Sequence, residues 1–142
     1  MPISIADLAQ SRRTFTMTTE WGPVQWTYRP YQMTPAREAE IERIVAKANE
    51  AETDGAIANI ERGVDKLVIQ FCEIVEATDM IGPLYPATDA RSGMGRGEPI
   101  VPAGETIPIE PRTVRHFSGR FIVDTLRAIG ADSRPKKAMP DE

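Results

Sequence analysis

Two stripes of apolar residues at helical spacing, separated by a short break, constrain this fold more than any other feature of the sequence. They predict helices over about residues 35–52 and 56–77, because side chains three and four positions apart share one face of a helix. The break, Thr53-Asp54-Gly55, is so short that we expect the two helices to pack antiparallel. The stripe residues are Ile41, Ile44, Val45 and Ala48, followed by Ile57, Ile60, Val64, Leu67, Val68, Phe71, Ile74 and Val75.

A β-hairpin is predicted ahead of these helices, over residues 12–30. Its first strand is rich in β-branched and aromatic residues, and Glu20-Trp21-Gly22-Pro23 has the composition of a turn. The second strand alternates, which places its apolar residues on one face and its polar residues on the other. The apolar residues of that strand are Val24, Trp26 and Tyr28.

Short local signals mark the ends of the helices. Thr34-Pro35 supplies an N-cap hydroxyl and a proline at the first helical position, where the missing N–H costs nothing. Pro111 opens one helical turn through Val114. Ser118 caps a last helix, 118–129, which we expect Gly130 to end.

The stretch 78–111 is rich in Pro and Gly and is predicted to be a long loop, with a small hairpin between 98–101 and 106–109. Such a loop is unusual in a small domain, so we expect its order to depend on a partner. The sequence therefore predicts an α+β protein, an N-terminal β-hairpin followed by a mainly α-helical domain with a long Pro/Gly-rich loop. The predicted single domain is 1–131, and 132–142 is predicted to be a flexible tail.

Composition favours a protein of the cytoplasm. The chain has 142 residues, of which 41% are hydrophobic, yet no apolar run approaches the roughly 20 residues that span a bilayer. The N-terminus lacks the cationic and apolar regions of a secretory signal, and the single cysteine, Cys72, cannot form an internal disulfide. We therefore expect neither a membrane span nor an oxidising compartment.

The net charge of −4 is unevenly distributed. Residues 1–37 carry +2, residues 38–80 carry −7 and residues 81–142 carry +1. An acidic middle argues against nucleic acid as the main ligand, because that affinity depends on Lys and Arg neutralising phosphates. The interpretation is that a basic peptide is the better partner, with the glutamates between Glu38 and Glu52 forming a solvated helix face.

No residues in the sequence indicate catalysis, a cofactor or a metal. Cys72 and His116 lie on different segments, and we interpret Cys72 as a small buried hydrophobe and His116 as a partly exposed side chain. A structural zinc site needs four ligands, and the Cys and His residues supply two. The glycines of 93–97 resemble a phosphate-binding loop, but no strand precedes them and no helix follows, so a flexible loop is the interpretation. Trp21, Trp26 and Tyr28 are interpreted as hairpin-to-helix packing rather than a base-stacking surface.

Protein binding is the remaining hypothesis. Burying a Leu, Ile or Phe is worth about 1.5–3 kcal/mol, so any surplus of the apolar stripes needs a partner or a second copy to cover it. Helix-in-groove contacts with a helical peptide, and self-association, are both expected to use such a surplus. The residues predicted to contact the partner are Ile41, Ile44, Val45, Val64, Leu67 and Phe71.

A series of short motifs runs along nearly the whole chain: Ile5-Ala6-Asp7-Leu8, Arg12-Arg13-Thr14, Tyr28-Arg29-Pro30, Met33-Thr34-Pro35, Thr78-Asp79, Gly97-Glu98-Pro99-Ile100 and Ile109-Glu110-Pro111. Their order resembles that of the tail assembly chaperones of long-tailed, siphovirus-like bacteriophages. Thr78-Asp79 stands where many members of that family have Trp-Asp.

The resemblance implies a non-enzymatic protein of the host cell cytoplasm that binds the aggregation-prone tape-measure protein and promotes tail assembly, without a cofactor. Other tail proteins and a homo-oligomer are further expected partners, whereas nucleic acid and membrane are not. The alternative left open is a minor structural virion protein, a connector or tail accessory, in which 78–111 is an arm that orders on assembly.

Overall fold

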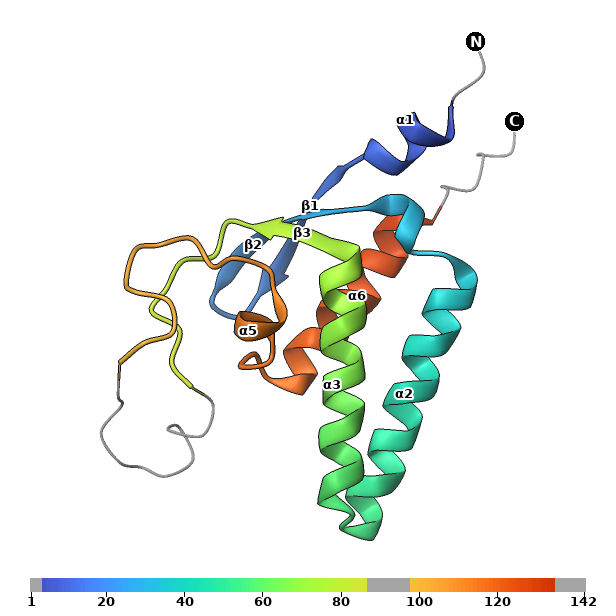
Figure 1. Ribbon diagram of the computed structural model, residues 1–142, viewed down its shortest axis with the longest axis vertical. Helices are drawn as coiled ribbons and strands as arrows, with labels where there is room; N and C mark the ends of the chain where they lie inside the picture. Colours follow the sequence, from blue (N-terminus) through green and yellow to red (C-terminus); the bar gives the residue numbers. More distant parts are fainter. Residues whose placement is uncertain (1–3, 87–97, 135–142) are drawn as a thin grey trace.

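Three antiparallel strands lie at one end of two long helices, α2 and α3, which run side by side (Figure 1). The computed structural model describes residues 4–86 and 98–134, and its α+β class agrees with the sequence prediction. The elements are α1 (Ile5–Gln10), β1 (Arg13–Thr19), β2 (Gly22–Tyr28), the 3-10 turn η1 (Pro30–Gln32), α2 (Pro35–Asp54), α3 (Ile57–Ile74), β3 (Val75–Thr78), α5 (Pro111–Val114) and α6 (Gly119–Ser133).

The predicted helix starts are confirmed by their hydrogen bonds. The hydroxyl of Thr34 accepts a bond from the N–H of Arg37, and Pro35 occupies the first turn of α2. The hydroxyl of Ser118 accepts from the N–H of Phe121 in the same way. Gly55 adopts a left-handed conformation, with φ of 72°, and ends α2, so the helices return antiparallel as expected.

The predicted hairpin has a third strand beside it, β3, most of which the sequence pattern assigns to the second helix. β1 pairs with β2, placing Phe15 opposite Trp26, and β3 pairs with the other side of β2, placing Val75 opposite Tyr28. The prediction of helix to residue 77 is therefore wrong, since α3 ends at Ile74. The helix was predicted too long because Val75 is apolar and buried like Ile74 before it, so its place in the sequence fits the helical stripe although it begins β3.

The core lies between the inner face of the sheet, α3 and α6. Trp26 is fully buried and meets Phe71 of α3 edge-to-face, with ring centroids 5.5 Å apart, and Phe71 meets Phe117 in the same manner. Trp26 and Tyr28 are core residues, as interpreted from the sequence. Trp21 is not, because the hairpin turn leaves it 87% exposed.

The described parts of 78–111 are packed onto the protein itself. The predicted hairpin between 98–101 and 106–109 is wrong, because each of these segments pairs instead with the chain leaving β3. The N–H of Leu84 donates to the carbonyl of Val101 at 3.0 Å, and the N–H of Ile107 donates to Met80 at 2.9 Å. Val101 and Ile107 are buried, so this packing needs no partner. Residues 87–97, with the glycines of 93–97, lie outside the described residues.

The last helix continues past its predicted end. Gly130 lies inside α6, which runs to Ser133, so residues 132–133 belong to the helix and not to a tail. A Cβ at residue 130 would stand 2.7 Å from Oε1 of Glu38, so the glycine makes room for a side chain of α2. Most of the predicted tail, 135–142, lies outside the described residues. Among the helices described, none is both long and apolar enough to cross a membrane.

Candidate protein-binding site

Four of the six residues predicted to contact a partner belong to the protein's own core. Ile41, Ile44, Leu67 and Phe71 are buried where α2, α3 and α6 meet. Val45 and Val64 are partly buried and pack against that core. The assignment of Ile41, Leu67 and Phe71 as a binding surface is corrected accordingly, because a side chain enclosed by its own fold has no surface to offer a partner. Ile44 is nearly as buried, but it belongs to the lining of the groove between α2 and α3.

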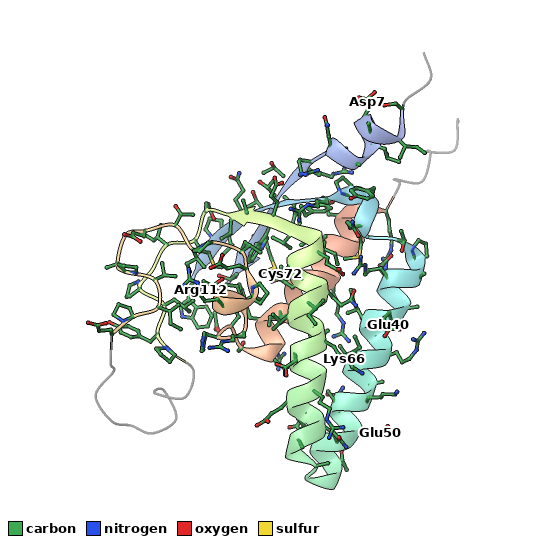
Figure 2. The ribbon with its side chains drawn as sticks, viewed as in Figure 1. Asp7, Glu40, Glu50, Lys66, Cys72 and Arg112 are labelled. Carbon is green, nitrogen blue, oxygen red and sulfur yellow. The ribbon has the colours of Figure 1, made fainter. Side chains whose placement is uncertain are left out.

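A groove lies on the seam between α2 and α3. It encloses about 430 Å³ and lies at the part of the helical pair that extends away from the sheet (Figure 1). Figure 2 shows Glu40 and Glu50 along α2 and Lys66 on α3, the two helices that form its walls. The groove is lined by Glu40, Arg43, Ile44, Lys47, Ala48, Glu50, Ala51, Ala56, Asn59, Arg62, Gly63 and Lys66.

Small residues make the floor of this groove. Gly63 of α3 is buried, and a Cβ built on it would lie 3.3 Å from the Cβ of Ala48, so the helices approach closely there. Ala51 and Ala56 add little bulk at the nearby turn. The sequence assigns Gly63 a helix-propensity cost of about 1 kcal/mol relative to Ala, and the close approach is the structural reason for a glycine at that place.

Cations dominate the rim. Arg43 and Lys47 are one turn apart on α2, and Arg62 and Lys66 are one turn apart on α3, so each pair faces the same side of its helix. Arg43 is bonded to Glu40. Within the described part of the chain, Lys47, Arg62 and Lys66 form no ion pair. The rim has these four cations and two acids, Glu40 and Glu50, so its net charge is +2.

The acids of α2 that face α6 are neutralised within the protein. Arg127 donates two bonds to Glu42, at 2.8 and 2.9 Å, and Arg134 donates one to Glu38 at 2.8 Å. The bonds from Arg127 lower the pKa of Glu42 below its ordinary value. The expected solvated acidic face is present, since Glu42, Glu50 and Glu52 are exposed, but two of its acids, Glu38 and Glu42, are engaged by arginines of the same chain. A basic peptide as partner stays a prediction.

Cys72 and His116 lie on separate elements, α3 and the turn after α5. Burial and the nearby carboxylate of Glu110 raise the pKa of the half-buried Cys72 thiol to about 11, which suppresses its nucleophilic form at neutral pH. Burial and the adjacent Arg115 lower the pKa of His116. In residues 4–86 and 98–134, no three His, Cys, Asp or Glu side chains cluster in a way that could hold a metal ion.

The basic rim was missed by sequence reasoning, although its signal was present. Two pairs of cations at a spacing of four residues fall on the faces that flank the small residues of the seam. Their effect disappeared in the net charge of −7 for residues 38–80, because a sum over a segment carries no direction. No protein-family model, no curated protein and no solved structure matches this chain, so the groove and its charges are read from this molecule alone.

Proposed function

We propose that this chain is a non-enzymatic tail assembly chaperone of a long-tailed bacteriophage, and that it holds a helical segment of the tape-measure protein in the groove between α2 and α3. The observation that carries the proposal is the groove itself, with small residues along its floor and a net positive rim. The order of motifs that resembles this family supports the choice of partner. Such a chaperone acts in the host cell cytoplasm.

The shape and charge of the groove favour an acidic amphipathic helix as its occupant. Small floor residues such as Ala48 and Gly63 let the backbone of a second helix approach, and apolar side chains of that helix would cover them. Lys47, Arg62 and Lys66 would then face carboxylates at the edges of the bound helix. Charges at such a rim steer association and confer specificity more than they add affinity.

A long tape-measure protein exposes apolar helix faces before the tail tube encloses it, and exposed faces of this kind aggregate. A chaperone that covers them needs reversible contacts, because it must leave during assembly. A small groove with a screened, charged rim fits that requirement, since exposed ion pairs contribute only about 0.2–1 kcal/mol each. Binding is expected to weaken as salt is raised.

Co-expression with the tape-measure protein of the same phage tests the proposal. We expect the chain to raise the soluble yield of that protein, and to be present in infected cells but absent from purified virions. No gain in solubility would refute the chaperone function. Recovery of the chain in purified particles would instead favour the minor virion protein with an arm at 78–111.

The groove is tested separately by charge neutralisation. The triple variant Lys47→Gln, Arg62→Gln, Lys66→Gln is expected to weaken binding about tenfold, from three exposed ion pairs. The matched control neutralises three exposed arginines outside the groove, Arg112, Arg115 and Arg120, and changes the net charge equally. If the two triple variants bind the tape-measure protein with equal affinity while the wild type is an active chaperone, the groove is not the binding site.

A further inference from the structure

β1 is an edge strand without the usual protection against pairing. The sheet order is β1-β2-β3, so β1 has β2 on one side only, and no residue in the described ranges pairs with its other side. Natural edge strands are commonly guarded by proline, a bulge or inward charges. β1 reads Arg-Thr-Phe-Thr-Met-Thr-Thr, with its one charge at the first residue. Its open side is therefore competent to accept another strand.

The register tells which backbone groups face that open side. Thr19 is opposite Gly22 across a two-residue turn, and pairs along an antiparallel ladder alternate between bonded and non-bonded. Pro23, which has no N–H, is opposite Thr18 and so occupies a non-bonded pair. It follows that the N–H and C=O groups of Thr14, Thr16 and Thr18 point away from β2, toward the open edge.

The pattern of β1 is complementary to itself when two copies run antiparallel with Thr16 opposite Thr16. Thr14 then faces Thr18 of the second copy, so the outward-pointing backbone groups meet. Phe15 faces Met17 of the second copy on the inner side of the sheet, where both are only partly buried in one copy. At each end of the paired strands, Arg12, which is bonded to Glu76 at 2.9 Å within its own copy, also comes opposite Glu20 of the second copy, a residue of opposite charge.

The same arrangement covers the two most exposed large apolar side chains of the described residues, Trp21 and Ile5, together with Leu8. Trp21 at the hairpin turn is 87% exposed, and Ile5 and Leu8 of α1 are 85% and 50% exposed. Figure 1 shows α1 projecting beyond the start of β1, away from the helical pair, and Asp7 marks this projecting helix in Figure 2. In the antiparallel pair, Trp21 of the second copy stands opposite Ser11, the residue that directly follows α1. Each copy thus brings its tryptophan to the bare helix of the other.

We infer that two copies of this chain associate through β1, forming one continuous six-stranded antiparallel sheet with Trp21 of each copy packed against α1 of the other. The occupant is a second copy and not a strand of another protein, because charge, apolar pairs and exposed ends all match under a two-fold axis through Thr16. Such an interface is isologous, and it closes after two copies.

Sedimentation of the full chain over a range of concentrations tests this inference. We expect a dimer of twice the 15.7 kDa chain mass. Thr16→Pro removes an outward N–H without breaking a bond to β2, and should give a monomer. Trp21→Ala removes an exposed aromatic side chain that the pair would bury against α1, and should weaken the dimer tenfold or more. The control is Ile69→Ala on α3, which removes another exposed apolar side chain and should leave the dimer unchanged.

Amide hydrogen exchange gives a readout that does not depend on the variants. The N–H groups of Thr14, Thr16 and Thr18 should become protected as the concentration rises through the dimer range, because they acquire partners only in the pair. A chain that stays monomeric, a dimer whose Thr16 amide exchanges freely, or a dimer that Ile69→Ala weakens as much as Trp21→Ala would each overturn the proposal.

Discussion

The phenol hydroxyl of Tyr28 donates a 2.6 Å hydrogen bond to Oδ2 of Asp132, a residue 104 positions later in the chain. Tyr28 is fully buried in β2, and Asp132 lies in the last turn of α6, where Arg13 also approaches it at 3.3 Å. Three elements from the two ends of the described chain are therefore joined at one carboxylate. This contact ties the last turn of α6, beyond Gly130, to the sheet.

Tyr28→Phe is expected to lower the free energy of unfolding by about 1–2 kcal/mol, because it removes a hydrogen bond to a charged group and leaves the packing intact. Urea unfolding at neutral pH measures the loss. Tyr31→Phe is the control, since Tyr31 is exposed, and its change should stay within about 0.5 kcal/mol. Equal effects of the two substitutions would contradict the role given to the Tyr28 bond.

The same tyrosine predicts a loss of stability in alkali. Burial, together with the hydrogen bond to Asp132, raises the pKa of Tyr28 above its ordinary value of 10.0. The folded state therefore holds the phenol proton more tightly than the unfolded state does, and this contribution is complete below pH 10 and falls away above it. The wild type should lose stability more steeply above pH 10 than Tyr28→Phe, as measured by urea midpoints across the alkaline range.

The ion pair between Glu42 and Arg127 predicts a dependence at the opposite end of the pH scale. Because Arg127 lowers the pKa of Glu42 below its ordinary value of 4.5, the pair contributes stability above about that pH and loses it as the pH falls further. Both side chains are about half exposed, so the contribution is about 0.2–1 kcal/mol. Wild type and Glu42→Gln should differ near pH 7, and the difference should shrink as the pH falls below 4.5. Asp124→Asn, whose pair is longer at 3.7 Å, serves as the comparison.

Local signals in the sequence were enough to predict most of the helical framework. Thr34-Pro35, Gly55 and Ser118 each act on neighbouring backbone groups, so their effect can be read without knowing the tertiary structure. The same holds for the hairpin, whose strands are joined by a turn of two residues. These are features in which cause and consequence lie within a few positions of each other.

Features that depend on distant residues were not predicted. β3 forms because β2, nearly fifty residues earlier, offers an unpaired side, and nothing within residues 75–78 announces it. Gly130 has the usual appearance of a helix end, yet its role is to admit Glu38. The basic rim of the candidate groove was not predicted for the same reason, because it forms only where α2 and α3 pack side by side. The sequence does contain the cations, and only the packing of α2 against α3 brings them together.

Cys72 is expected to react slowly with thiol reagents. With its pKa raised to about 11, only about 0.03% of the thiol is ionised at pH 7.4, and its side chain is half-buried. Alkylation by iodoacetamide at pH 7.4 should be at least tenfold slower in the folded chain than in urea. Glu110→Gln should speed the folded reaction modestly, because it removes the smaller of the two causes of the shift. Equal rates in folded and unfolded chains would contradict this account.

The close approach of Gly63 and Ala48 predicts a coupling of definite sign. Gly63→Ala gains helix propensity of about 1 kcal/mol, but its new Cβ would lie 3.3 Å from that of Ala48, a contact tight enough to offset the gain. In the background Ala48→Gly the obstructing methyl group is absent, so Gly63→Ala should be more favourable there than in the wild type. Urea unfolding of the four chains gives the coupling energy, which is expected to reach about 0.5 kcal/mol or more. A coupling of zero would mean that the helices adjust freely at the seam, and the floor of the groove would then owe nothing to this glycine.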